Sequence, residues 1–162
     1  MAYHDRLTSI LGIQRLQNME NQKRTEERPW GKFTIIDEGH NYRVKRIFVR
    51  KGRRLSLQRH EHRDEHWSFV SGIGTLTLEL PGNLLAVLKN SGEPLLKTTM
   101  VGPNFQAKIP KGLLHRVEAI TDLVFFEVAI GDVDENDIER VEDDYGRLDK
   151  VRDKAKWTSE NE

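Results

Sequence analysis

Residues 52–72, GRRLSLQRHEHRDEHWSFVSG, contain two short β-like runs set between glycines. Alternate residues of a strand point to the same face of a sheet. Gln58 and His60 therefore share one face of the first run, together with Ser56. Glu65 opens the second run, on the face that also carries the two aromatic residues at the next alternate positions. The spacing predicts that these polar side chains converge inside a small barrel.

A fourth side chain with metal-binding chemistry follows in the segment PKGLLH, at His115. A set of Gln, His, Glu and His favours a mononuclear site, because these nitrogen and oxygen donors suit divalent zinc, manganese, iron, cobalt or nickel. By parity, His62 could join His60 instead. That register would place Arg54 where the first glycine belongs, so the spacing favours Gln58 with His60. The alternative interpretation is a polar core that holds no metal.

The composition indicates a single globular domain and excludes several classes of partner. The chain has 162 residues, with 26 Lys plus Arg and 26 Asp plus Glu, so its formal net charge is zero. That balance gives no electrostatic basis for binding nucleic acid or an anionic membrane. There is no cysteine, which excludes disulfides and thiolate metal sites and is typical of a cytoplasmic protein. The first 24 residues are charged throughout, so we expect neither a signal peptide nor a membrane span.

From Trp30 onward the chain consists of short β-like runs broken by Gly, Pro and Asn. Many short strands without helices between them predict an all-β antiparallel sandwich or barrel. We place one domain at 28–147, after an N-terminal extension at 1–27 and before a charged tail at 148–162. The expected strands are Phe33–Asp37, Tyr42–Arg50, Leu55–His60, His66–Val70, Thr75–Leu80, Phe105–Ile109, His115–Ala119 and Leu123–Ile130.

Three segments depart from this strand pattern. Residues 5–23 have apolar residues at helical spacing and predict an amphipathic helix, either packed on the domain surface or serving as a dimerisation arm. Residues 134–141, DENDIERV, predict a short helix. Residues 81–104 read as a long excursion with an extra hairpin around 84–88 and 95–100. Long loops in compact domains are often lids or binding loops.

The spacing of these residues resembles the cupin superfamily. The first cupin motif is G-x5-H-x-H-x4-E-x6-G, and here Gln58 replaces its first histidine. The second motif ends P-x-G-x-x-H, which this chain matches at Pro110, Gly112 and His115. Two positions depart from the pattern, since Ala119 replaces the usual later Asn and Asn104 stands where a glycine normally opens the second motif. The resemblance implies a double-stranded β-helix, or jelly roll.

A more specific resemblance is to the cupin domain of type II phosphomannose isomerases, which is often fused to mannose-1-phosphate guanylyltransferases. It rests on the segments RPWG at 28–31, LSLQRHEHRDEHW at 55–67 and DYGR at 144–147, and it extends over about 28–147. The chain shows no nucleotidyltransferase domain, so the resemblance implies a stand-alone version. It also implies a homodimer, and one metal ion, usually zinc, on Gln58, His60, Glu65 and His115.

The resemblance further implies interconversion of mannose 6-phosphate and fructose 6-phosphate through an enediol. That reaction needs an electrophile for the developing oxyanion, a base beside the carbon acid and a cation for the phosphate. Glu127, in the apolar run LVFFEVAI, is the expected base, and a structural pair with Lys45 or an arginine is the alternative. His62 is a second candidate for the base. Lys45 is expected to point into a polar cavity, where it would donate to a sugar oxygen or the phosphate; the alternative is an edge lysine whose charged end reaches solvent.

Three further residues are candidates for binding the substrate. Arg63 and Asp64 are expected to form a turn before Glu65, which puts Arg63 at the rim of the site, where its planar fork would suit a phosphate. Arg116 points outward by parity, although the family pattern has an arginine at that position. Ser56 shares the face of Gln58.

Other functions also fit the motifs. They are a cupin oxygenase or an isomerase of another sugar, a non-catalytic sugar-binding or assembly partner, and an oligomeric structural cupin without metal.

Overall fold

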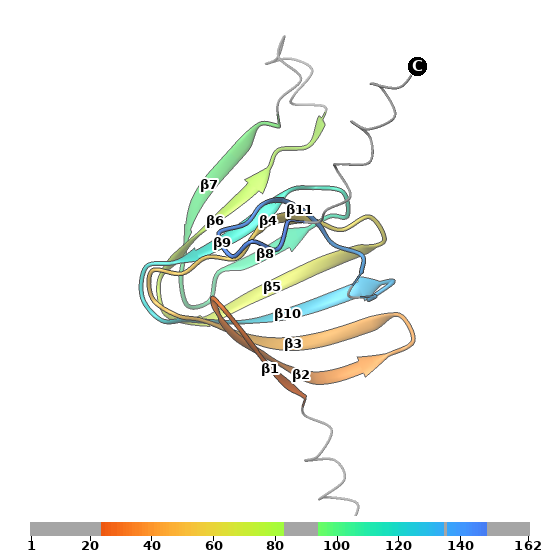
Figure 1. The fold of residues 1–162 in the computed structure, drawn as a ribbon, viewed down its shortest axis with the longest axis horizontal. Helices are drawn as coiled ribbons and strands as arrows, with labels where there is room; N and C mark the ends of the chain where they lie inside the picture. Colours follow the sequence, from red (N-terminus) through yellow and green to blue (C-terminus); the bar gives the residue numbers. More distant parts are fainter. Residues whose placement is uncertain (1–23, 83–93, 135, 149–162) are drawn as a thin grey trace, which may run out of the picture.

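The computed structural model describes residues 24–82, 94–134 and 136–148. They form two antiparallel sheets that face each other across a common core (Figure 1). The first sheet has the order β1 (Thr25–Arg28), β2 (Gly31–Gly39), β3 (Tyr42–Val49), β10 (Leu123–Gly131), β5 (Arg63–Ser71), β8 (Gln106–Ile109). The second has the order β11 (Glu139–Glu142), β4 (Leu57–Arg59), β9 (His115–Ala119), β6 (Gly74–Glu79), β7 (Leu96–Val101).

The core forms because alternate residues of each strand point between the sheets. In β10 the buried positions run from Leu123 through Phe125 and Glu127 to Ala129, and in β5 Trp67 and Phe69 are about 1% exposed. The rings of Phe69 and Phe125 stack with centroids 5.0 Å apart. Burying aromatic and aliphatic side chains contributes about 1.5–3 kcal/mol for each residue, so this layer is the main source of stability.

The all-β prediction is confirmed, and each of the eight expected strands overlaps an observed one. The largest difference lies before Glu65, where we expected a turn at Arg63 and Asp64. Both residues belong to β5, because the pairing of β5 with β10 begins at Arg63 opposite Gly131. The strand β1 was not expected from its sequence TEER. It forms as the edge partner of β2, with Arg28 opposite Gly31.

The predicted helix at 134–141 is wrong in the part that the structure describes. Glu139–Glu142 is the strand β11, which pairs with β4 and places Arg140 opposite Gln58. Before it, Asp134 accepts a hydrogen bond from the Asn136 amide, a side-chain turn that competes with helical bonding. Pairing with an open sheet edge therefore outweighs the local helical pattern.

Other predictions fall partly or wholly outside the described residues. The N-terminal helix at 5–23 lies outside them, as do 83–93 in the expected excursion and most of the charged tail. The second half of the expected hairpin is the strand β7, which pairs with β6. In the described ranges, no helix has the length and apolar character needed to cross a bilayer.

Two glycines of the opening motif occupy turns that need a positive φ. Gly52 has φ of 71° and Gly72 has φ of 85°, a region that other residues rarely adopt. A Cβ at Gly72 would lie 2.0 Å from the Asp122 carbonyl oxygen, whereas a Cβ at Gly52 would meet nothing within 4 Å. Close backbone packing thus requires glycine at 72, and the turn conformation alone favours it at 52.

Candidate metal centre and pocket

Three side chains that could hold a metal ion meet between the two sheets. His60 follows β4, Glu65 lies in β5 and His115 opens β9, and one ligand atom from each lies within 4.8 Å of the others. The Nε2 atom of His60 is 3.2 Å from Oε1 of Glu65, and that of His115 is 3.5 Å from Oε2. All three side chains are almost fully buried.

The second nitrogen of each histidine faces a backbone carbonyl. His115 Nδ1 donates to Leu113 O at 3.0 Å, and His60 Nδ1 donates to Asp137 O. These bonds place the proton on Nδ1 and leave both Nε2 atoms as acceptors near Glu65, that of His60 also 3.1 Å from Arg63 Nη2. The Nε2 of His115 is buried and has no hydrogen-bond partner among the described residues. Burial also lowers the pKa of His60 to about 4, so its ring is neutral near pH 7. Two buried lone pairs facing a carboxylate are well suited to a cation.

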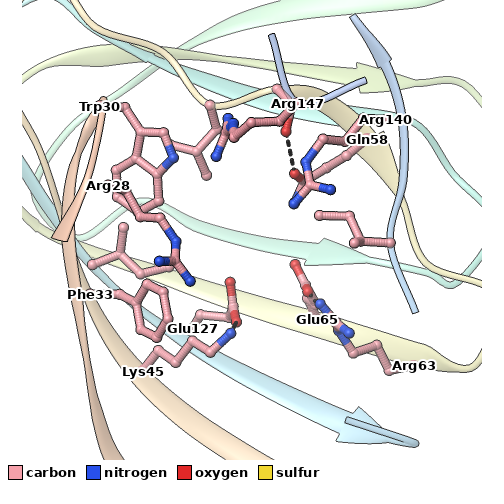
Figure 2. A pocket seen from close by; sticks show the side chains of 14 residues that line it. Arg28, Trp30, Phe33, Lys45, Gln58, Arg63, Glu65, Glu127, Arg140 and Arg147 are labelled. Carbon is pink, nitrogen blue, oxygen red and sulfur yellow. Dashed lines mark hydrogen bonds and ion pairs between the residues drawn. The ribbon is translucent and has the colours of Figure 1, made fainter. Parts of the chain in front are cut away.

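Gln58 lies beside this group. It pairs with His115 across β4 and β9, and its Nε2 is 3.5 Å from Nε2 of His60. Its Oε1 accepts a hydrogen bond from Ser56 Oγ at 2.7 Å, the contact drawn as a dashed line in Figure 2. Ser56 and Gln58 both line the pocket that Glu65 also lines. The expectation that Ser56, Gln58 and His60 share a face agrees with this arrangement.

Arg63 is inside the protein and not at the rim. It is 7% exposed because its place in β5 puts it on the face of Glu65, two residues away. Its Nε donates to Glu65 Oε1 at 3.0 Å and its Nη2 lies 3.1 Å from His60 Nε2. Burial raises the pKa of Glu65, but His115, His60 and Arg63 together hold it well below its usual range. Glu65 is therefore an ionised, buried ligand candidate.

Glu127 and Lys45 form a second buried pair in the same pocket (Figure 2). They are opposite each other in the ladder of β3 and β10, with Lys45 Nζ 3.8 Å from Glu127 Oε1. Burial, and next the charge of Glu65, raise the pKa of Glu127 to about 7, while Lys45 lowers it. Lys45 Nζ also lies 4.7 Å from the centroid of the Phe33 ring. Both expectations for Glu127, an inward carboxylate and a pair with Lys45, hold in the structure.

Two candidates lie away from the pocket. The side chain of His62 is 68% exposed and its Nδ1 lies 3.0 Å from Asp137 Oδ1. Arg116 points away from the core, as parity predicts, and donates to Glu142 Oε2 at 2.7 Å. Neither residue lines the pocket that contains Glu65 and Glu127.

The structure adds three arginines that our sequence analysis did not assign to the site. Arg28 from β1, Arg140 from β11 and Arg147 after β11 line the same pocket; in Figure 2, Arg140 and Arg147 lie around its upper part, and the guanidinium of Arg28 lies lower, beside Phe33. Arg28 and Arg147 belong to the segments RPWG and DYGR, which carried the resemblance. Those segments were therefore the available signal for these two residues.

Comparison with known proteins assigns the chain to a family. The sequence profile of the family described as "Mannose-6-phosphate isomerase C-terminal" matches residues 15–143. The mannose-1-phosphate guanylyltransferase ManC of Salmonella typhimurium is 39% identical over 124 residues, which cover 75% of this chain and 22% of that protein. The alginate biosynthesis protein AlgA of Pseudomonas aeruginosa is 34% identical over 157 residues, which cover 91% of this chain and 29% of that protein. The chain thus spans less than a third of the length of these relatives.

Solved structures with the same fold are more distant in sequence. The capsular polysaccharide assembling protein CapF of Staphylococcus aureus superposes with a TM-score of 0.60 at 21% identity, covering 75% of this chain and 33% of CapF. An oxalate decarboxylase of Lactobacillus farciminis superposes with a TM-score of 0.58 at 18% identity, covering 75% of this chain and 34% of that enzyme. These structural similarities support the assignment of the fold. Function is inferred from the sequence family and from the site.

Proposed function

The chain belongs to the family of mannose-6-phosphate isomerase C-terminal domains, and on this premise we propose that it is a metal-dependent isomerase of mannose 6-phosphate and fructose 6-phosphate. The observation that carries the proposal is one pocket that combines a candidate metal centre with a separate buried carboxylate of raised pKa. An aldose–ketose isomerisation uses both, since a proton moves between C2 and C1 while charge develops on the neighbouring oxygen.

In this proposal Gln58, His60, Glu65 and His115 hold one divalent ion, with zinc as the first choice. A bound divalent ion would polarise the sugar carbonyl and stabilise the enediolate oxygen. Glu65 is the only anion among these four residues, so the centre would keep about one positive charge. Arg63, which donates to Glu65, would hold that carboxylate in its orientation.

Glu127 is the proposed base. Its pKa of about 7 leaves a large fraction ionised near neutral pH and still gives it affinity for a substrate proton. Lys45 Nζ lies 3.8 Å from the carboxylate and lines the same pocket. We propose that Lys45 donates a hydrogen bond to a sugar oxygen while Glu127 moves the proton between the two carbons. Ser56 would position Gln58 through its 2.7 Å hydrogen bond.

A coupled assay that detects fructose 6-phosphate formed from mannose 6-phosphate tests this function. We expect turnover that is lost on treatment with a chelator and restored by a divalent metal. The double variant Gln58→Ala and His60→Ala should lose the activity and most of its bound metal. Turnover that persists after both treatments would contradict the metal-dependent mechanism.

A further inference from the structure

We propose that Arg28, Arg140 and Arg147, which line the same pocket as Glu65 and Glu127, form the binding site for the substrate's phosphate group. This inference rests on the proposed isomerase function and names how that site would recognise its substrate. The three arginines come from β1, from β11 and from the segment after β11, so residues from both ends of the domain line one pocket. We call these three residues the arginine wall.

The first argument is the charge of the lining. Among the residues that the structure describes, five cationic side chains line the pocket, those of Arg28, Lys45, Arg63, Arg140 and Arg147, together with two carboxylates. The two carboxylates already have cationic neighbours, because Arg63 donates to Glu65 and Lys45 lies 3.8 Å from Glu127. The other three cations are the arginines of the wall, of which Arg28 and Arg147 form ion pairs with carboxylates outside the lining. A lining with more cationic than anionic side chains favours an anion as ligand.

The second argument is the way in which two of these arginines are held. The Nε and Nη2 atoms of Arg147 contact Asp143, with the shortest distance 2.5 Å, and the Asp143 side chain is completely buried. Arg28 donates to Glu26 through Nη2 at 2.5 Å, and its guanidinium lies 5.0 Å from the centroid of the Phe33 ring. Neither Glu26 nor Asp143 lines the pocket. Each of these two guanidinium groups is therefore held by a carboxylate that does not line the pocket. This lowers the conformational entropy that the arginine side chain loses when an anion binds.

The third argument is the geometry of the wall. Among the described residues, Nη1 of Arg147 and Nε of Arg28 form no hydrogen bond with the protein. Arg140 stands opposite Gln58 in the β11–β4 ladder, so it lies on the side of the candidate metal centre. Three guanidinium groups that approach from different elements suit a phosphate with three terminal oxygens better than a planar carboxylate, which one fork can satisfy.

This assignment differs from the expectation that Arg63 and Arg116 bind the phosphate. Arg63 is occupied with Glu65 and His60, and Arg116 donates to Glu142 away from the pocket. A phosphate held by the arginine wall would direct the sugar carbons toward Glu127 and the metal centre. The three arginines would therefore contribute binding affinity and also fix the orientation of the substrate in the pocket.

Binding measurements can test the wall without depending on turnover. We expect mannose 6-phosphate and inorganic phosphate to bind the protein in calorimetry, and mannose to bind much more weakly. Arg28→Gln and Arg147→Gln should each weaken binding of mannose 6-phosphate by about tenfold or more, since charge-assisted hydrogen bonds are lost. Arg46→Gln is the matched control, because Arg46 is exposed on the opposite face of β3. Arg28→Lys and Arg147→Lys should retain part of the affinity.

The outcomes separate this inference from the proposed function. Arginine-dependent binding of phosphate in a protein that does not isomerise mannose 6-phosphate would support the wall and overturn the isomerase. Normal isomerisation with unchanged KM and unchanged binding in both glutamine variants would overturn the wall. Failure of the wild-type protein to bind phosphate would overturn it as well. If Arg147→Gln does not fold because Asp143 loses its partner, binding of mannose 6-phosphate is compared in Arg28→Gln and Arg147→Lys instead.

Discussion

The carboxylate of Glu127 and the ammonium group of Lys45 lie 3.8 Å apart across the ladder of β3 and β10, and each side chain is at most one-tenth exposed. Lys45 stabilises the ionised form of Glu127, whereas burial and the charge of Glu65 favour the protonated form. The pKa of this carboxylate therefore depends on its neighbours, each of which can be changed separately.

Replacing Lys45 with Met should raise the pKa of Glu127, because the variant lacks the cation that favours the carboxylate. The acidic limb of the pH profile of kcat/KM should move to higher pH by roughly one unit or more. Arg46→Met is the control, since Arg46 is the next residue and points to the opposite face. An acidic limb that stays at the wild-type position in Lys45→Met would show that the ion pair does not tune the base.

The activity of the wild-type protein should depend on pH with an apparent pKa near that of Glu127, which is raised to about 7. A base must be ionised to accept a proton, so kcat/KM should fall about tenfold for each pH unit below this value. Glu127→Gln should reduce kcat by about 10²–10⁴-fold and remove the limb. If Glu127→Gln keeps the wild-type kcat and the acidic limb of its pH profile, Glu127 is excluded as the base.

Removing His115 should abolish tight metal binding. In the wild-type protein we expect about one divalent ion per chain, and an excess of Zn²⁺ at 100 times its Kd should add about 2.7 kcal/mol to the free energy of unfolding. His115→Ala should lose the ion in elemental analysis and no longer gain thermal stability from zinc. His66→Ala is the matched control, because the exposed His66 points away from the core. Equal metal content in the two variants would contradict the proposed centre.

Gly72→Ala should destabilise the protein much more than Gly52→Ala. Both positions have a positive φ, so each alanine costs about 1 kcal/mol of conformational energy. Only at position 72 would the new Cβ also overlap a backbone atom, the Asp122 carbonyl oxygen at 2.0 Å. We expect a further loss of about 2 kcal/mol or more there. Denaturant unfolding of the two variants measures the difference in unfolding free energy. Equal losses of stability would show that the backbone at position 72 moves away from Asp122 at little cost.

Asp137→Asn should reduce stability at neutral pH by about 1–2 kcal/mol, because the Asp137 carboxylate accepts hydrogen bonds from the Glu61 and His62 amides. Burial raises the pKa of Asp137, but these bonds and the His62 side chain lower it below the usual value of 3.8. The wild-type advantage is therefore fully present above pH 3.8 and is lost as pH falls through the lower, folded-state pKa. Measuring the unfolding free energy of the wild type and of Asp137→Asn at pH values above and below 3.8 tests whether the difference disappears at low pH. Glu61→Gln is the control, because Glu61 is exposed.

The arrangement of the candidate metal centre followed from sequence because it depends on local rules. Strand alternation and glycine spacing are enough to direct His60 and Glu65 inward, and a second short motif supplies His115. The location of Arg63 was wrong because we took it as part of a turn. Its strand conformation comes from pairing with Gly131, which is distant in sequence.

The arginine wall could not be predicted in the same way. Arg28 and Arg140 enter the pocket only because β1 and β11 pair with the edges of the two sheets. The sequence TEER has no apolar alternation, and ERVE follows a segment that reads as helical. Edge pairing is a property of the assembled sheets, and a local pattern does not contain it.

The pairing of β11 with β4 also has a consequence during protein synthesis. The ion pair between Arg59 and Glu139 joins residues 80 positions apart, so β4 leaves the ribosome long before its partner exists. At translation speeds of about 5–20 residues per second, the edge of β4 stays open for roughly 4–16 s. Arg140 and Arg147 emerge even later than Glu139, which means that a nascent chain can bury its hydrophobic layer before the proposed phosphate site is complete.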